Sequence, residues 1–417
     1  MKNFLKVIKT TLIIVLLSSL VGGALLSLAF LLPDSSIQAN AKTSSQQLTG
    51  TGEYPYVISS LNTTILDNYT DAIMINSSSF IPNGCSLLER SLEISRAQYN
   101  WTSSPIEDLY EYYNDENAIT QSETYERYWH GYIILLRPLL MLLDLSGIRF
   151  ACCVTHFILL FMFIRMLEKK VNLSIAISFL VTYLCFSCYA IPLSLQYSHI
   201  FFIMLISGMI LMKFNDKFKQ KRWTKYFFLL IGIVTVYFDL LTYPIITLGI
   251  NLILYILINK EINIKDIIVY IIMWFVGYGG MWFMKWVIAS LVLNENVFEN
   301  AYNAIITRTN SNHNFEIITL SKVFNVNLSY LKHRATLITF LADFVANVII
   351  AFKENKKSLD LDINKLVSFI IIFVLPILWL FILKEHSYTH SQFVFRILMI
   401  DTFAILALPQ CMIKSKA

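Results

Sequence analysis

Residues 5–32 read LKVIKTTLIIVLLSSLVGGALLSLAFLL, and no charged side chain follows Lys9 in this stretch. About 20 apolar residues suffice for an α-helix to cross the hydrocarbon core of a bilayer, so the stretch predicts a membrane-spanning helix. The whole chain agrees, because 56% of its 417 residues are apolar and only 15% are charged, whereas soluble domains carry about 25% charged residues. The composition excludes a soluble enzyme and indicates a membrane protein.

Further apolar runs of similar length follow, separated by polar breaks. Together they predict an all-α polytopic membrane protein with about ten transmembrane helices and a large first extracytoplasmic loop. The expected spans are residues 5–32, 149–167, 173–193, 198–214, 226–241, 243–258, 267–293, 337–352, 366–383 and 394–412. The two runs on either side of residues 239–244 could instead form one broken element.

Lysine and arginine are unevenly distributed over the connecting segments. If the N-terminal segment lies inside, the inner segments hold 20 of the 33 Lys and Arg residues. The positive-inside rule then predicts a multi-pass protein of the cell membrane with both termini in the cytoplasm. The basic residues behind the net charge of +5 lie mostly in loops and form no clustered basic surface, so nucleic acid is not an expected partner.

The expected spans divide the chain into five parts. These are a first transmembrane helix at 1–32, an extracytoplasmic loop with interfacial helices at 33–148, a transmembrane bundle at 149–293, a second extracytoplasmic loop at 294–336 and C-terminal transmembrane helices at 337–417. The small-x-small sequence at 39–41 lies well beyond the first apolar run, which is itself longer than a typical signal-peptide core, so we expect an uncleaved anchor.

The first loop opens with a Ser-, Thr- and Gln-rich segment through Glu53, which we expect to be flexible, and then becomes aromatic and acidic. Ser104-Pro105-Ile106-Glu107 predicts the start of a helix that runs through Tyr113, because serine can cap a helix and proline suits its first position. The apolar stretch 133–144 is too short to span a membrane and predicts an interfacial or re-entrant helix.

Carboxylates of the first loop are the candidates for catalysis. In the stretch LDNYTD at 66–71, Asp67 and Asp71 lie four residues apart, and a helix would place both on one face. Such carboxylates can accept a proton from a sugar hydroxyl or coordinate a divalent cation, Mg or Mn, through oxygen ligands. The alternative is a solvated turn in which Asp and Asn bond to their own backbone. Asp34, directly after the first span, is a third candidate.

Basic and aromatic side chains gather before two of the expected spans, at the depth of a lipid phosphate. Arg and His can donate charge-assisted hydrogen bonds to such a phosphate. The alternative is snorkelling of arginine to the headgroups or, for a lone histidine, a structural role in the core. The residues expected to bind the lipid phosphate or substrate are Arg127, His130 and Arg137 before the second span, His386, His390 and Arg396 before the last, and His199.

Four charged side chains lie within or beside the expected spans, namely Lys285, Asp239, Asp343 and Asp401. Charges inside a bilayer are costly and usually face the interior of a bundle, so each is a candidate functional residue. The alternative is a structural ion pair between Lys285 and Asp343 or Asp401. The sequence contains no Walker A, GxGxxG or HExxH motif, which leaves nucleotide-driven transport and zincin chemistry without support.

This organisation resembles the GT-C superfamily of integral-membrane glycosyltransferases. The similarity lies in the first span, the large acidic first outer loop with interfacial helices, and the further spans with long outer loops. The segments 67–71, 127–132 and 386–396 also resemble parts of multi-pass proteins of low-GC Gram-positive bacteria. The resemblance implies that a first-loop carboxylate acts as base or metal ligand and that the sugar donor is a polyisoprenoid phosphate.

The chain departs from that superfamily in one respect. It has no adjacent pair of acidic residues soon after the first span, and Glu107-Asp108 comes much later. The catalytic carboxylate therefore stays open among Asp34, Asp67, Asp71 and the pair Glu107/Asp108.

From the resemblance we expect an inverting membrane glycosyltransferase that moves a sugar from a polyisoprenoid-phosphate donor to a cell-envelope glycan or other acceptor on the outer face. Asp67 or Asp71 would deprotonate or orient the acceptor hydroxyl, and Arg and His would hold the phosphate. The expected partners are donor, acceptor and lipid bilayer, and the expected cofactor is a divalent cation. The alternatives are a polymerase of lipid-linked repeat units, and a non-enzymatic flippase or scaffold subunit of envelope polysaccharide synthesis.

Overall fold

The computed structural model describes residues 2–118, 121–313, 316–354 and 362–411, and nearly all of its regular structure is helical. Within these ranges, seven helices are long and apolar enough to cross a membrane. They are α1 (Lys2–Phe30), α7 (Leu145–Lys170), α9 (Leu195–Gln220), α12 (Ile264–Leu293), α15 (Arg334–Glu354), α16 (Ile363–Ile382) and the segment Ser391–Gln410. The last comprises α18 (Ser391–Val394), η3 (Phe395–Leu398) and most of α19 (Met399–Cys411). The predicted helical, polytopic architecture is confirmed.

Three shorter apolar helices complete the bundle: α8 (Leu173–Cys185), α10 (Thr224–Phe238) and α11 (Ile246–Ile258). The predicted third span 173–193 is therefore wrong as one helix. Ser187 has a left-handed backbone with φ of 48°, and the chain continues as the 3-10 turn η2 (Cys188–Leu193), which contains Pro192. Proline lacks the amide hydrogen that would extend an α-helix, which explains the break.

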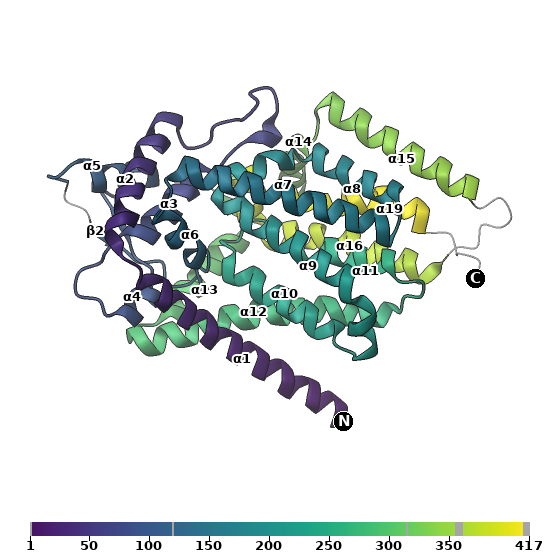
Figure 1. Cartoon of the computed structure of the whole chain (residues 1–417), viewed down its shortest axis with the longest axis horizontal. Helices are drawn as coiled ribbons and strands as arrows, with labels where there is room; N and C mark the ends of the chain where they lie inside the picture. The colour runs from purple at the N-terminus through teal and green to yellow at the C-terminus, as the bar shows by residue number, and fades with distance from the viewer. Residues whose placement is uncertain (1, 119–120, 314–315, 355–361, 412–417) are drawn as a thin grey trace.

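Figure 1 shows the long helices lying side by side along the longest axis of the molecule. Two glycines explain how closely α10 and α12 pack. A Cβ atom on Gly232 would lie 2.1 Å from the Trp274 carbonyl oxygen, and one on Gly277 would lie 2.2 Å from the Leu229 carbonyl oxygen. Small residues let helix backbones approach, and this is a common basis of helix association in membranes.

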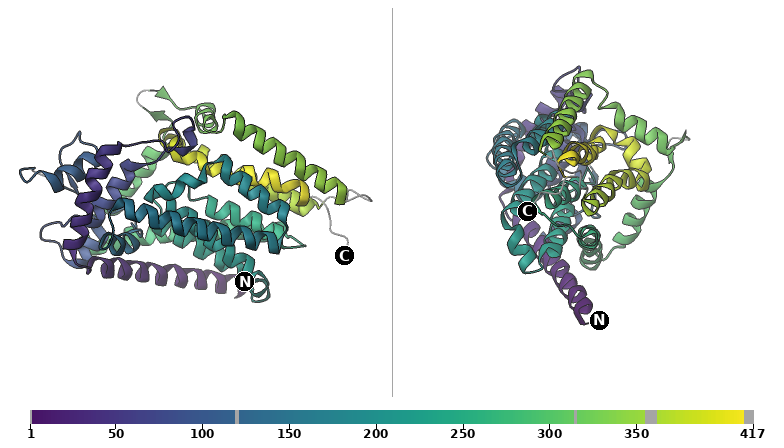
Figure 2. Two further views of the ribbon diagram at one scale, coloured as in Figure 1. Left: turned by 45° about the horizontal axis from the view of Figure 1, so that its top comes forward. Right: turned by 90° about the vertical axis from the view of Figure 1, so that its right-hand side faces the viewer.

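The two ends of the bundle differ. One end, here called the loop end, carries α2 (Asp34–Thr51), η1 (Asn62–Thr64), α3 (Asn68–Ser79), α4 (Leu87–Glu93), α5 (Pro105–Asn114), α6 (Ile133–Leu140), α13 (Val297–Thr309), α14 (Leu320–Ser329) and α17 (Lys384–Thr389). At the opposite end, here called the turn end, residues 221–223 join α9 to α10. Figure 2 shows the start of α1 and the end of α19 toward the turn end.

The predicted flexible segment through Glu53 is wrong for residues 34–51, which form the helix α2. Ile37, Ala41 and Leu48 recur at helical spacing and are fully buried, and the small Ser44 and Ser45 lie on the same buried face. This face packs against α3, α5 and α7, so tertiary contacts stabilise a segment whose polar composition suggests disorder.

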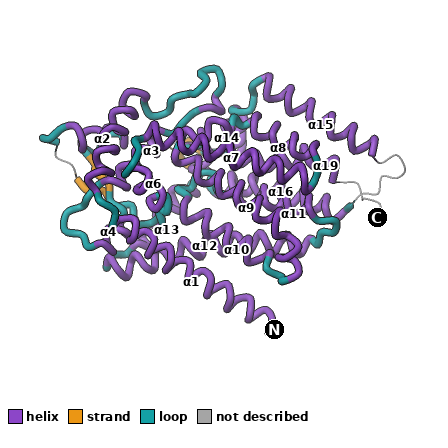
Figure 3. Tube along the Cα trace, viewed as in Figure 1, coloured by secondary structure: helices purple, strands orange, loops and turns teal. Residues whose placement is uncertain are grey.

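Other expectations for the loop end are confirmed. Helix α5 begins at Pro105, and its cap Ser104 accepts a hydrogen bond from the backbone amide of Glu107. Two short antiparallel pairs are the strands seen in the described ranges: β1 (Arg96–Gln98) with β2 (Gln121–Glu123), and β3 (Asn312–His313) with β4 (Glu316–Ile317). Figure 3 shows how small they are beside the helices.

Candidate functional site

An apolar groove opens between α12, α13 and α16 near the loop end, with a volume of about 430 Å³. Its lining residues on α12 extend from Ile271 to Trp286, about 22 Å of helix axis at 1.5 Å per residue. Aromatic and aliphatic side chains dominate it. The lining consists of Arg127, Tyr128, Leu241, Ile245, Ile271, Phe275, Tyr278, Trp282, Trp286, Ala301, Ala304, Ile305, Arg308, Leu375, Leu378, Trp379, Ile382 and Leu383.

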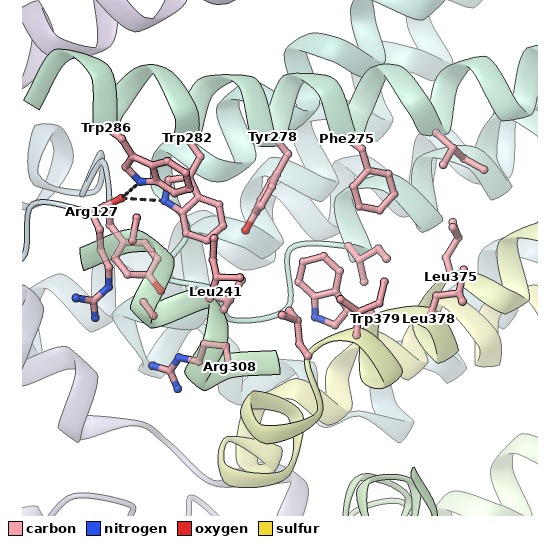
Figure 4. A pocket seen from close by; sticks show the side chains of 18 residues that line it. Arg127, Leu241, Phe275, Tyr278, Trp282, Trp286, Arg308, Leu375, Leu378 and Trp379 are labelled. Atoms are coloured by element: carbon pink, nitrogen blue, oxygen red, sulfur yellow. Dashed lines mark hydrogen bonds between the residues drawn. The ribbon is translucent and has the colours of Figure 1, made fainter. Parts of the chain in front are cut away.

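The two charged side chains of this lining gather at one end. Figure 4 shows Arg127 and Arg308 on the side of Trp286, whereas Phe275, Leu375 and Leu378 lie at the other extremity. The groove is therefore amphiphilic, with a cationic mouth at the loop end and an apolar interior that extends toward the middle of the bundle.

Arg127 is held in place through hydrogen bonds to its backbone carbonyl. Its carbonyl oxygen accepts hydrogen bonds from the indole nitrogens of Trp282 (2.9 Å) and Trp286 (3.0 Å) on α12. Its guanidinium donates to Asn300 Oδ1 (3.1 Å) and lies 4.5 Å from the centre of the Tyr125 ring. Since two indoles hold the segment to the long helix, the arginine has a defined position at the mouth.

The charge of Arg127 is not neutralised within the protein. Among the residues that the structure describes, no carboxylate lies within 4.0 Å of its guanidinium, and its Nε has no hydrogen-bond partner. A half-buried cation without a counter-ion is costly. An anionic group that enters the groove would provide the missing acceptor.

Arg308 on α13 faces α17. Its Nη1 donates to His390 Nε2 over 2.7 Å, and the same nitrogen lies 4.0 Å from Glu385 Oε2. Of the predicted phosphate ligands, Arg127 thus lines the mouth and His390 contacts it through Arg308. His386 lies beside them but donates its Nε2 hydrogen to the carbonyl of Leu241 (2.6 Å), and burial lowers the pKa of His386, so it stays neutral.

His130 and Arg137 lie outside the groove, and the nitrogens of the His130 ring and the Arg137 guanidinium form hydrogen bonds within the protein. His130 Nε2 donates to the Tyr125 carbonyl (2.9 Å), Nδ1 accepts from Tyr132 (2.9 Å), and burial lowers the pKa of His130 to about 3. Arg137 donates to three carbonyls, including those of Ala29 and Leu32 at the end of α1, and to Asp34. The structure gives both residues structural contacts in place of a free phosphate-binding group.

His199 and Arg396 also lie apart from the mouth. His199 lines a separate cavity of about 420 Å³ formed mainly by α6, α7 and α9. Arg396 is fully buried and donates to the carbonyls of Gln392 (3.1 Å) and Thr63 (3.2 Å), with its guanidinium 4.3 Å from the centre of the Tyr197 ring. It attaches η1 to the last transmembrane segment.

Two of the predicted catalytic carboxylates form internal ion pairs. Asp34 accepts hydrogen bonds from Arg90 (3.0 Å) and Arg137 (2.9 Å). Burial alone would raise the pKa of Asp34, but the two arginines outweigh this effect, and the net result is a pKa below the ordinary value. Asp71 is fully buried, pairs with Arg149 (2.8 Å) and accepts from the Leu195 amide (2.9 Å) at the start of α9. Asp71 therefore serves as a cap for a helix distant in sequence.

Asp67 is the cap of its own helix, α3. Both of its oxygens accept from Thr70, one from the amide and one from the hydroxyl, each over 2.9 Å. Burial raises the pKa of Asp67 to about 7 despite these bonds. Its side chain is 1% exposed and does not line the groove, so the predicted shared surface of Asp67 and Asp71 does not form.

These carboxylates do not suit a bound divalent cation. The oxygens of Asp71 already accept from Arg149, Ser194 and two amides, and those of Asp67 accept from Thr70. Within the described ranges, no group of three His, Cys, Asp or Glu side chains could hold a metal ion. Asp108, the other buried candidate, accepts from the Tyr99 amide and from the Ser103 hydroxyl.

Three of the four charged groups predicted inside the bundle have local partners, whereas Asp401 Oδ1 is buried and has no hydrogen-bond partner in the described residues. Lys285 donates to the Leu92 carbonyl over 2.6 Å, so the predicted ion pair with Asp343 or Asp401 is wrong. Asp343 accepts from Ser178 (2.8 Å) and Asn347 (3.0 Å). Asp239 accepts from Thr242 and from the Tyr278 hydroxyl (2.9 Å), which places it close to the groove.

Four residues at the mouth were not singled out from the sequence: Arg308, Glu385, Trp282 and Trp286. One signal was available. Tyr278, Trp282 and Trp286 recur every fourth residue, and this spacing places three aromatic side chains on one face of α12. Arg308 and Glu385 have no comparable local pattern, because they meet only through the packing of α13 against α17.

Comparison of the chain with models of known protein families, with curated proteins and with solved structures found no match. The geometry of the groove and its mouth is therefore the basis for a function.

Proposed function

We propose that this protein is a membrane glycosyltransferase that binds a polyisoprenoid-phosphate sugar donor in the groove between α12 and α16. The observation that carries the proposal is the amphiphilic groove, with two arginines at one end and an apolar interior along about 22 Å of α12. A polyisoprenoid phosphate has the same division into a long apolar chain and an anionic head. Arg127 and Arg308 supply donors for the phosphate, and the aromatic walls accommodate the chain.

Glu385 is the carboxylate that pairs with Arg308 at this mouth, 4.0 Å from its guanidinium. In the proposed reaction, an acceptor hydroxyl attacks the anomeric carbon of the donor. The new glycosidic bond forms as the bond to the phosphate oxygen breaks, and the electron pair leaves with the phosphate. The hydroxyl proton passes to Glu385, and the anomeric configuration inverts. Glu385 thus takes the role that the sequence suggested for Asp67 or Asp71.

The experiment measures donor binding directly. A polyisoprenyl-phosphate sugar with a photoreactive group on its chain is irradiated with the full-length protein, and the labelled peptides are identified by mass spectrometry. We expect labels on α12 and α16 that decrease strongly in Arg308→Gln and Arg127→Gln. Lys384→Gln is the matched control, since Lys384 precedes Glu385 on α17 but donates to Ser311 and does not line the groove.

A cellular measurement tests the activity. Envelope glycans are compared by mass spectrometry between a strain lacking the protein and strains that carry wild type, Arg308→Gln or Lys384→Gln at equal membrane abundance. Loss of a defined sugar that wild type and Lys384→Gln restore, but Arg308→Gln does not, supports the transferase. If every variant restores all glycans, the groove is not catalytic and a scaffold role is favoured. If the deletion changes no glycan, the proposal is abandoned.

A further inference from the structure

A second charged cavity lies at the turn end of the bundle, away from the mouth of the groove. It has a volume of about 390 Å³ and is formed by the end of α9, the start of α10, and parts of α11 and α12. Three cationic side chains and one carboxylate contribute to its wall. The lining residues are Lys219, Arg222, Thr224, Lys225, Tyr255, Asp266, Val269 and Tyr270.

None of the three cations is neutralised by an ion pair within 4.0 Å in the part of the chain that the structure describes. Lys219 Nζ donates instead to Asn259 Oδ1 over 2.9 Å. Asn259 is itself held by reciprocal amide hydrogen bonds with the buried Asn215, at 3.0 and 3.2 Å. A neutral amide pair thus fixes the ammonium group without cancelling its charge.

Arg222 occupies a backbone position that favours glycine. Its φ is 56°, its amide donates to the Lys219 carbonyl (3.0 Å), and the following Trp223 amide donates to the Phe218 carbonyl (2.8 Å). This is the Schellman pattern at the end of α9, in which glycine usually takes the left-handed residue. A left-handed arginine is strained. Strained residues that persist often have a functional side chain, and here the side chain lines the cavity.

The start of α10 adds a fourth source of positive potential. Thr224 and Lys225 are its first two residues, and its cap residue Trp223 makes no side-chain capping bond. Amide hydrogens in the first turn of a helix lack intrahelical acceptors and carry partial positive charge. Trp223 is 46% exposed beside the cavity. Tryptophan concentrates at the membrane interface, so this position fits the depth of lipid headgroups.

We propose that this cavity binds the phosphate group of an anionic membrane lipid. The headgroup phosphate would accept hydrogen bonds from Arg222, Lys225 and Lys219, with Tyr255 and Tyr270 as the wall beneath it. Basic pockets between transmembrane helices are suited to lipid headgroups of this charge. The proposal does not depend on the transferase activity, because the cavity and the cationic mouth of the groove have different lining residues and lie at opposite ends of the bundle.

The test titrates dioctanoyl phosphatidylglycerol into the full-length protein in a neutral detergent and counts bound lipid by native mass spectrometry. Dioctanoyl phosphatidylcholine, which has a phosphate but no net charge, is the comparison lipid. We expect tighter binding of phosphatidylglycerol, and a loss of roughly fivefold for each of Arg222→Gly and Lys225→Gln, which corresponds to about 1 kcal/mol per cation. Glycine suits the backbone at 222, so Arg222→Gly retains or raises the melting temperature.

Lys221→Gln is the matched control. Lys221 adjoins Arg222, but its ammonium lies 4.7 Å from the centre of the Trp223 ring and does not line the cavity. Unchanged binding in this variant supports the site. An equal loss in Lys221→Gln and Arg222→Gly shows diffuse attraction only and overturns the proposal. Inorganic phosphate is titrated in parallel, and binding of this ion without binding of phosphatidylglycerol overturns the assignment to a lipid.

Discussion

Asp71 and Arg149 form an ion pair of 2.8 Å in which the carboxylate is fully buried. The pair joins α3 to α7, and the second oxygen of Asp71 accepts from the amides of Leu195 (2.9 Å) and Gln196 (3.3 Å) at the start of α9. One carboxylate therefore connects the loop end to two long helices. This makes Asp71 a structural residue, in contrast to the role in catalysis that its place in the sequence suggested.

We predict that Asp71→Asn destabilises the protein strongly, because Arg149 is left without its counter-ion in a poorly solvated place. Loss of one partner of a buried pair costs about 3–5 kcal/mol. The measurement is the apparent melting temperature of the purified protein in detergent. The double variant Asp71→Asn/Arg149→Gln should recover part of the loss. If Asp71→Asn melts like wild type but abolishes glycan transfer, the structural assignment is wrong.

Asp67 should make stability depend on pH in the opposite direction to an ion-paired carboxylate such as Asp34, whose pKa is lowered in the folded protein. Because burial raises the pKa of Asp67 to about 7 in the folded protein, from an ordinary value of about 3.9, folding favours the protonated form. The stabilisation is complete below about pH 4 and is lost as the pH rises through 7. Asp67→Asn retains an acceptor for the Thr70 amide, so it should match wild type at pH 4 and exceed it by a growing margin up to pH 8.

The expected gain at pH 8 is on the order of 4 kcal/mol, because raising a pKa from about 3.9 to about 7 is worth about 1.4 kcal/mol for each pH unit between the two values. Thermal melting of both proteins from pH 4 to pH 8 measures it. Parallel pH profiles for wild type and Asp67→Asn would show that this carboxylate does not titrate in the range.

The membrane character of the chain was predictable because apolar runs need no tertiary context. Positions 34–51 were not, since the polar Ser, Thr and Gln residues of α2 hide the buried stripe of Ile37, Ala41 and Leu48. The lengths of the shorter apolar helices were also difficult to predict. Helices α8, α10 and α11 are shorter than the expected spans 173–193, 226–241 and 243–258, because a 3-10 turn and loops take up the remaining residues.

Individual site residues were harder to rank, because their roles depend on partners far along the chain. Arg137 and Arg308 are both arginines close to apolar stretches. Arg137 meets carbonyls about 100 residues away at the end of α1, which occupy its guanidinium. Arg308 instead meets His390 at the mouth of an apolar groove. Local spacing cannot distinguish the two cases, since the difference is made by helix packing.

Close contact between α10 and α12 gives a third prediction. Gly232→Ala and Gly277→Ala would each place a methyl group within about 2.2 Å of a backbone oxygen on the facing helix, so the helices must separate. We expect a loss of about 1–3 kcal/mol for each. The control is Gly279→Ala on the exposed face of α12, where a Cβ meets nothing within 4 Å. That change should stabilise the helix by up to about 1 kcal/mol. Equal melting temperatures for all three would contradict the packing argument.

The mouth of the groove gives the last prediction, which separates binding from chemistry. Glu385 lies 4.0 Å from Arg308, so Glu385→Gln removes the proposed base and should lower the turnover of a purified transferase assay by about 100-fold or more. Donor binding should change little, because the Arg308 and Arg127 guanidiniums stay in place. Arg308→Gln should act mainly on binding, and we expect it to weaken donor binding by roughly tenfold. Glu299→Gln, on the exposed face of α13, controls for loss of a nearby negative charge. If Glu385→Gln weakens donor binding and leaves turnover of the bound donor intact, then Glu385 orients Arg308 and a different group accepts the proton.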